Sequence, residues 1–161
     1  MSKKMIVCIA LLLFLTGIVA IAHLRSQETI TCMEILQQEQ RITVSFEDLN
    51  QGTFSGELID GKGDVTFHEY TGILLKELLE RKNIDLTATS GVTITSADNY
   101  SVEFTADELL QTDKIYVAIT VDGMKIEGIK AGTEGVQVIV FGDPNSHRCV
   151  RFAQRITIEM P

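Results

Sequence analysis

The stretch from Thr71 to Leu79 reads Thr-Gly-Ile-Leu-Leu-Lys-Glu-Leu-Leu. Its apolar residues recur three and four positions apart, with a lysine and a glutamate between them. This spacing places the apolar side chains on one face of a helix and the charged ones on the other. We therefore predict an amphipathic helix from Gly72 to Arg81, with Thr71 as its N-cap and Asn83 just beyond its end.

Short alternating segments on both sides of this helix are typical of strands. They carry β-branched and aromatic residues at alternate positions. The clearest turn signals between them are Asp60-Gly-Lys-Gly-Asp64, Asp98-Asn-Tyr100 and Asp122-Gly123. The predicted strands cover residues 41–46, 53–59, 65–70, 92–96, 100–104, 114–121, 124–126, 135–141 and 149–159.

A second short helix is predicted from Ala106 to Gln111, because Thr105-Ala-Asp-Glu108 has the form of a capping box. Ser45 is expected to cap one further helical turn. Eight or nine strands with two short helices, and no regular alternation of strand and helix, predict an α+β fold of mostly β mixed sheets. A doubly wound parallel sheet is not expected.

The N-terminal residues differ from the rest of the chain. The run from Met5 to Ala22 is nearly all apolar and follows Lys3 and Lys4, which is typical of an export segment. Ala20-Ile-Ala22 has the form of a signal-peptidase site, whereas the length of the run is close to that of a membrane-spanning helix. Cleavage and retention both remain open.

Both readings place the rest of the chain outside the cytoplasm, either secreted or anchored to the cytoplasmic membrane. We accordingly divide the chain into residues 1–24, a signal peptide or membrane anchor, residues 25–40, a linker or first strand, and a domain over residues 41–161. The 161 residues suffice for one domain with a hydrophobic core. The membrane is a further partner through residues 5–22 if that segment is not cleaved.

The charge of the chain limits its other partners. The formal net charge is −8. An acidic protein repels phosphate backbones, so a nucleic-acid partner is not expected. The remaining candidates are a small anionic ligand or another protein outside the cytoplasm.

Two arginines are the main candidates for a binding site. Arg148 and Arg151 follow a loop that begins at Gly142, and two arginines at this spacing could hold a phosphate by charge-assisted hydrogen bonds. The alternative is a solvated strand face on which they pair with the chain's many acids. The sequence contains no His-Glu-x-x-His, Cys-x-x-Cys or Gly-x-Ser-x-Gly motif, so we predict no catalytic residues and no protein-bound metal.

The domain has two cysteines, Cys32 and Cys149. Outside the cytoplasm they could form a disulfide that ties the start of the domain to its last strand, and buried free thiols are the alternative. Cys149 stands two residues after His147, like a thiol beside a base. A β-strand, however, does not lower a thiol pKa as a helix N-terminus does.

Several short segments also follow one another in a recognisable order. They are Val44-Ser-Phe-Glu-Asp-Leu49, Gly72-Ile-Leu-Leu-Lys-Glu-Leu-Leu79, Asp98-Asn-Tyr100 with Glu108-Leu-Leu110, Asp122-Gly123, and Ser146-His-Arg-Cys-Val-Arg-Phe-Ala-Gln-Arg-Ile156. In this order they resemble the oxidoreductase molybdopterin-binding domain, the pterin-holding module of the sulfite oxidase family.

The resemblance implies a sulfite-oxidase-like fold over most of the chain. It also implies that the basic stretch with His147, Arg148 and Arg151 lies beside the pterin phosphate. Members of the family carry a cysteine ligand to molybdenum before the Gly-x-x-Leu helix, but residues 46–71 contain no cysteine. We therefore expect a non-catalytic module for a small anion or a protein, without molybdopterin. A molybdopterin-dependent oxidoreductase, or a subunit of one, and a membrane-anchored structural domain are the alternatives.

Overall fold

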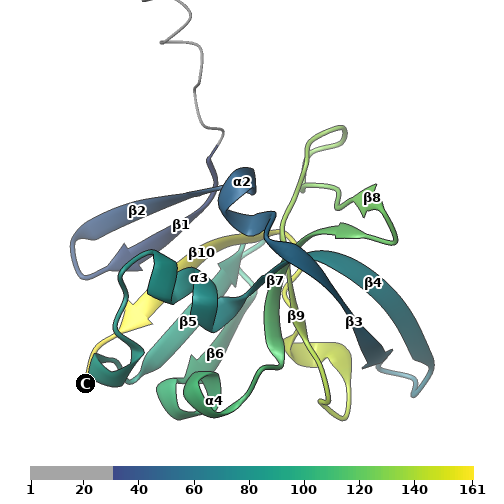
Figure 1. Cartoon of the computed structure of the whole chain (residues 1–161). Helices are drawn as coiled ribbons and strands as arrows, with labels where there is room; N and C mark the ends of the chain where they lie inside the picture. The colour runs from purple at the N-terminus through teal and green to yellow at the C-terminus, as the bar shows by residue number, and fades with distance from the viewer. Residues whose placement is uncertain (1–30) are drawn as a thin grey trace, which may run out of the picture. The chain divides into compact units, whose positions relative to one another are not determined.

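Two β-sheets with short helices make up residues 31–161, the part of the chain that the computed structural model describes (Figure 1). The first sheet has the strand order β2-β1-β10-β5-β6, and only its β1–β10 pairing is parallel. Its strands are β1 (Thr31–Gln37), β2 (Gln40–Ser45), β5 (Gly91–Ser96), β6 (Ser101–Thr105) and β10 (Ala153–Glu159).

The second sheet is antiparallel throughout and has the order β3-β4-β7-β8, with β9 paired to β7. Its strands are β3 (Gly52–Ile59), β4 (Val65–Leu74), β7 (Ile115–Val121), β8 (Met124–Lys125) and β9 (Gln137–Val140). The helices are α2 (Phe46–Leu49), α3 (Leu75–Arg81) and α4 (Ala106–Gln111), with 3-10 turns η1 (Leu86–Ala88) and η2 (Ser146–Arg148). The predicted α+β class, mostly strands with few short helices, is confirmed.

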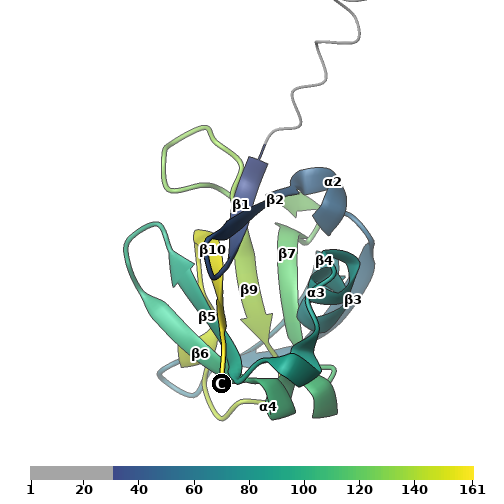
Figure 2. The same ribbon diagram turned by 90° about the vertical axis from the view of Figure 1, so that its left-hand side faces the viewer.

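The main hydrophobic core joins both sheets to the helices. In the turned view of Figure 2 the first sheet lies on one side and α3 and α4 on the other. Leu75, Leu78 and Leu79 of α3 are fully buried, as expected for the apolar face of an amphipathic helix. From the sheets, the core takes Ile35, Val44, Ile94, Phe104, Ile156, Ile73, Val117 and Val138.

A second, smaller cluster is formed by residues of the second sheet. Tyr70, Ala118, Ile126 and Ile139 are buried in it. The rings of Phe54 and Tyr116 stack on it with their centroids 4.1 Å apart. The second sheet therefore has apolar side chains on both faces.

The predicted helix begins later than expected. α3 starts at Leu75, and Gly72 belongs to β4, so Thr71 is not the N-cap. The N-cap is Leu74, which makes no side-chain capping bond. Gly72 lies opposite Ala118 at an irregularity in the β4–β7 register, and a Cβ there would lie 2.0 Å from the carbonyl oxygen of Val117. This close approach of β7 keeps Gly72 in the sheet.

The predicted turns are confirmed. Residues 60–64 connect β3 to β4, and Asp122-Gly123 connects β7 to β8 with positive φ values of 49° and 75°. Asn83 and Asn99 also have positive φ. These positions take residues that tolerate the left-handed region.

The predicted export segment lies in residues 1–30, outside the described part of the chain. β1 falls within residues 25–40, the stretch assigned to a linker or first strand. Over residues 31–161, no helix combines the length and the apolar character that crossing a membrane requires.

Asp48 closes the capping box of α2 and links this helix to the end of α3. Its Oδ2 accepts hydrogen bonds from the Ser45 N–H at 2.8 Å and the Ser45 hydroxyl at 3.0 Å, and lies 2.8 Å from Lys82 Nζ. Partial burial opposes ionisation. The bonds from Lys82 and Ser45 nevertheless hold the pKa of Asp48 below its ordinary value.

We predict that Asp48→Asn lowers the free energy of unfolding by about 1 kcal/mol above pH 5. A carboxylate with a lowered folded-state pKa stabilises the fold above its unfolded pKa of about 3.9, and this contribution is lost as the pH falls through the folded value. The difference between wild type and variant should therefore shrink below about pH 4. Urea denaturation from pH 3 to pH 7 measures it, and a difference that does not change with pH would contradict the prediction.

Candidate functional site

The segment that carries the predicted site residues is not a strand. The expected strand over residues 149–159 is wrong in its first part, because β10 begins only at Ala153. Arg148 ends the 3-10 turn η2, Val150 forms an isolated bridge with Val138, and Phe152 has a φ of +54°. The two arginines therefore lie on an irregular loop, which lets them point to different surroundings.

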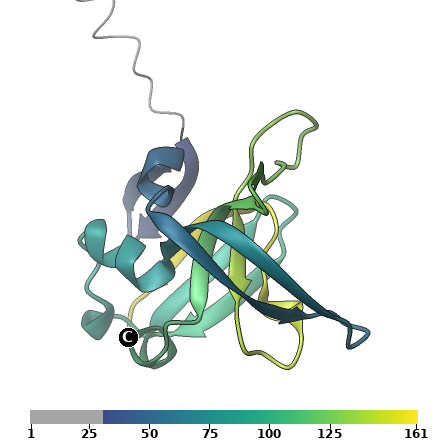
Figure 3. The ribbon, with the colours of Figure 1, turned by 45° about the vertical axis from the view of Figure 1, so that its right-hand side comes forward.

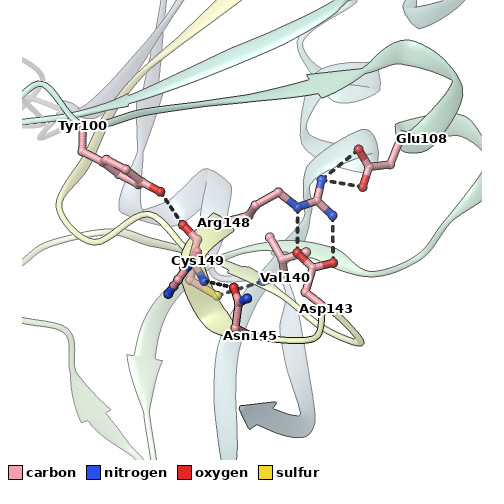
Figure 4. Close-up of polar contacts among 8 residues, drawn as sticks. Tyr100, Glu108, Val140, Asp143, Asn145, Arg148 and Cys149 are labelled. Carbon is pink, nitrogen blue, oxygen red and sulfur yellow. Dashed lines mark hydrogen bonds and ion pairs between the residues drawn. The ribbon is translucent and has the colours of Figure 1, made fainter. Parts of the chain in front are cut away.

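Arg148 is held by two carboxylates of the domain (Figure 4). Its Nε and Nη2 donate to the two oxygens of Asp143 at 2.6 and 2.8 Å. Its Nη1 donates to both oxygens of Glu108 at 2.8 and 3.1 Å. The guanidinium carbon lies 5.2 Å from the centroid of the Phe104 ring. The hydrogen bonds to Asp143, which have the largest effect, raise the pKa of Arg148, and those to Glu108 raise it further. Partial burial acts in the opposite direction but is outweighed.

This geometry gives Arg148 a structural role. Its Nε–H and both of its terminal nitrogens are bound to carboxylates of the same chain, so the site that the sequence predicted for an external phosphate is already filled. The Glu108 carboxylate faces Arg148, while its backbone N–H donates to the Thr105 hydroxyl at 3.2 Å. Thr105 is thus the predicted N-cap of α4, and Arg148 ties this helix to the loop of Asp143.

Arg151 has different surroundings, although it lies only three residues further along the chain. Its side chain is exposed, and its guanidinium carbon lies 5.4 Å from the centroid of the Phe152 ring. Among residues 31–161, no carboxylate forms an ion pair with it. Arg151 therefore keeps its hydrogen-bond donors for an external partner.

A cleft of about 420 Å³ opens beside Arg151. One side is the face of the β3–β4 hairpin that carries His68 and Tyr70, and the other is the loop that carries Cys149 and Arg151. The remaining lining residues are Leu58, Asp60, Thr66, Val121, Gln137 and Ser146. A second hollow of about 290 Å³ shares Val121, Gln137 and Arg151 with the cleft, so Arg151 borders both.

His68 is oriented by an aspartate. Its Nδ1 lies 2.7 Å from Oδ2 of Asp122, and the other oxygen of Asp122 accepts from the Glu69 N–H at 3.1 Å. Both contacts lower the pKa of Asp122, and the contact with His68 has the larger effect. The Nε2 atom of His68 makes no hydrogen bond within the described part of the chain. It therefore remains able to bind a ligand.

Cys32 and Cys149 are both free thiols in the structure, which is the second of the two alternatives that the sequence left open. The Cys32 thiol donates to the Val44 carbonyl at 3.3 Å, and Cys149 Sγ accepts from the Val140 N–H at 3.4 Å (Figure 4). Burial raises the pKa of Cys32 to about 12 and also raises the pKa of Cys149. Cys149 thus lines the cleft as a protonated thiol, a poor nucleophile and a poor metal ligand.

His147 does not join Arg151 in the cleft. Its backbone carbonyl accepts a hydrogen bond from the Tyr100 hydroxyl, and its ring lies near the β3–β4 turn, where a Cβ on Gly61 would be 3.5 Å from Nε2. Of the three predicted binding residues, the structure places only Arg151 in the cleft. Sequence reasoning missed His68, Tyr70 and Gln137, although the alternation of β4 could have shown that residues 66, 68 and 70 share a face. Within residues 31–161, no group of three His, Cys, Asp or Glu side chains could hold a metal ion.

No family model matches the chain, and no curated protein matches it. Among solved structures, the chain is similar to the sulfane dehydrogenase SoxCD from Paracoccus pantotrophus. The TM-score is 0.63, the sequence identity is 15%, and the match covers 81% of this chain and 38% of that chain.

The chain shares the fold of part of this enzyme. The expected sulfite-oxidase-like α+β fold is therefore confirmed. An identity of 15% shows the fold alone, and the chain spans well under half of the SoxCD chain that it matches.

Proposed function

We propose that this chain is a non-catalytic binding module that holds a small oxyanion in the cleft beside Arg151. The observation that carries the proposal is an arginine without an ion-pair partner among residues 31–161, at the edge of a cleft of about 420 Å³. A guanidinium recognises sulfate, phosphate or carboxylate by paired, charge-assisted hydrogen bonds.

Most of the other polar residues of the cleft support this chemistry, and the one acid in its lining, Asp60, accepts hydrogen bonds from the N–H groups of Lys62 and Asp64. Ser146 and Gln137 bring a hydroxyl and an amide that can donate to an oxyanion. His68, oriented by Asp122, can donate through Nε2 when it is protonated. One permanent cation with several neutral donors suits a small anion of low charge.

The donor set does not fit the molybdopterin that the family resemblance implies. Arg148 is bound to Asp143 and Glu108, so the phosphate of the pterin would have only Arg151. Residues 46–71 contain no cysteine, and burial keeps Cys149 protonated. A cleft with one free arginine and no thiolate favours a small anion over a pterin that carries a metal.

We further propose that the module works outside the cytoplasm, delivered by the apolar segment of residues 5–22. The support is the sequence pattern of that segment, an apolar run that follows Lys3 and Lys4 and ends in Ala20-Ile-Ala22. Mass spectrometry of the N-terminus from native membranes separates a cleaved signal peptide, with a mature chain from His23, from a retained anchor.

Arg151→Ala is expected to weaken binding of sulfate and phosphate at least about tenfold, because it removes the only unpaired cation of the cleft. Isothermal titration calorimetry with each sodium salt measures the effect. Arg41→Ala is the matched control, since Arg41 is an exposed arginine of β2 that pairs with Glu34. Equal losses in both variants would show that net charge, and not the cleft, governs binding.

The same protein should be made in a host able to synthesise molybdopterin and analysed for molybdenum and released pterin. Stoichiometric cofactor would overturn the proposal in favour of an oxidoreductase or a subunit of one. Protein without cofactor that binds sulfate through Arg151 would support the binding module.

A further inference from the structure

The β3–β4 hairpin extends away from the rest of the domain, toward the right in Figure 3. β3 ends the second sheet, so within residues 31–161 no strand pairs with its outer edge. Its eight residues contain no proline, and its register with β4 is regular over the whole length. Natural proteins usually shorten, bulge or block an exposed edge of this kind, because its free backbone groups can pair with another chain.

The free backbone groups can be assigned to residues. The Asp60 N–H donates to the Asp64 carbonyl at 2.9 Å. Asp60 and Asp64 therefore form a hydrogen-bonded pair, and the next pair of the ladder is Ile59 opposite Val65. Hydrogen-bonded and non-hydrogen-bonded pairs alternate along an antiparallel ladder. The N–H and C=O groups of Ile59, and by the same alternation those of Glu57 and Ser55, therefore point away from β4 toward solvent.

The same stretch exposes apolar side chains among acidic ones. Val65 and Phe67 are 57% and 66% exposed and lie opposite Ile59 and Glu57, which puts all four side chains on one face of the hairpin. Glu69 is exposed on that face next to Phe67. This face lies opposite the one that lines the Arg151 cleft, so the two surfaces can act separately.

We propose that the outer edge of β3 binds an extended segment of a partner protein in which basic and apolar residues alternate. Such a segment would hydrogen-bond to Ser55, Glu57 and Ile59 as an added strand. Alternate side chains of a strand point to opposite faces, so the basic residues of the segment would lie beside Glu57 and its apolar residues would lie on the other face, beside Leu58. A second copy of this chain fits less well, because it would bring another protein of net charge −8 to an edge that carries Glu57.

The experiment uses the full-length chain and a fluorescein-labelled peptide of five Lys-Val repeats, with fluorescence anisotropy as the readout. The Lys-Val peptide should bind, and neither a Glu-Val peptide nor a Lys-Val peptide N-methylated at alternate residues should. Glu57→Lys is expected to weaken binding about tenfold. Glu103→Lys, which changes an exposed glutamate of the other sheet's edge strand β6, should leave it unchanged.

Amide hydrogen exchange locates the contact. Slower exchange at Ser55 and Glu57 in the complex supports strand addition. Equal binding of the N-methylated peptide, equal losses in Glu57→Lys and Glu103→Lys, or unchanged exchange along β3 would overturn it. Sedimentation tests the alternative of self-association. If the wild-type chain were a dimer and Glu57→Lys a monomer, the partner at this edge would be a second copy of the chain, and the proposal of a different protein would be wrong.

Discussion

Gly72→Ala is expected to lower the free energy of unfolding by about 3 kcal/mol or more, a large fraction of the total stability of a domain this size. A Cβ at this position would lie 2.0 Å from the Val117 carbonyl oxygen and 2.9 Å from the Ala118 Cα. Both atoms belong to the backbone of β7 and cannot rotate away. The methyl group would force β4 and β7 apart at the point where α3 begins.

Gly52→Ala is the matched control for this prediction. Gly52 lies directly opposite Gly72 in the β3–β4 ladder, yet a Cβ there would meet no atom within 4 Å. Its replacement should change the stability by no more than about 0.5 kcal/mol. Urea denaturation of the two variants and the wild type gives the comparison. A similar loss of stability in both variants would mean that the replacement of any glycine in this ladder is destabilising, and that the contact with β7 is not the cause.

Arg148→Met is expected to destabilise the fold by about 2 kcal/mol, because it leaves Asp143 and Glu108 facing each other without a cation. Methionine can keep contact with the Phe104 ring, so most of the loss should come from the missing charge and hydrogen bonds. The ion group is partly exposed to solvent, which keeps the expected cost below that of a fully buried pair.

Two further variants separate charge from packing. Asp143→Asn and Glu108→Gln, introduced together into Arg148→Met, should recover part of the lost stability, since the facing carboxylates are then neutral. Arg151→Ala should change stability little, because Arg151 forms no ion pair among the described residues. Thermal and urea unfolding measure both effects. If the triple variant were less stable than Arg148→Met alone, repulsion between the carboxylates could not be the cause.

The turns of this fold could be predicted from sequence because they depend on local backbone preferences. Asp122-Gly123 and Asn99 adopt positive φ values that few other residues tolerate. The start of α3 could not be predicted in the same way. Gly72-Ile-Leu-Leu fits both a strand and a helix, and the approach of Val117 from β7 decides between them.

The site shows a similar limit. Arg148 and Arg151 are chemically identical in the sequence, and their spacing suggested one shared anion site. The structure separates them, because Glu108, forty positions away along the chain, reaches Arg148 and leaves Arg151 free. The sequence contains the acids but does not show which arginine they reach. His68 could have been found, since the alternation of β4 places it beside Tyr70.

The place of β10 in the first sheet also determines when the domain can fold during synthesis. β10 lies between the β1–β2 hairpin and the β5–β6 hairpin, pairing with β1 on one side and β5 on the other. A ribosome makes β10 after the other four strands of this sheet, so the two hairpins have no strand to join them until Ala153–Glu159 has been made. Pairing between the first and last strands is also a long-range contact of the kind that slows folding. A chain that stops before Ala153 would lack the strand that joins the two halves of this sheet.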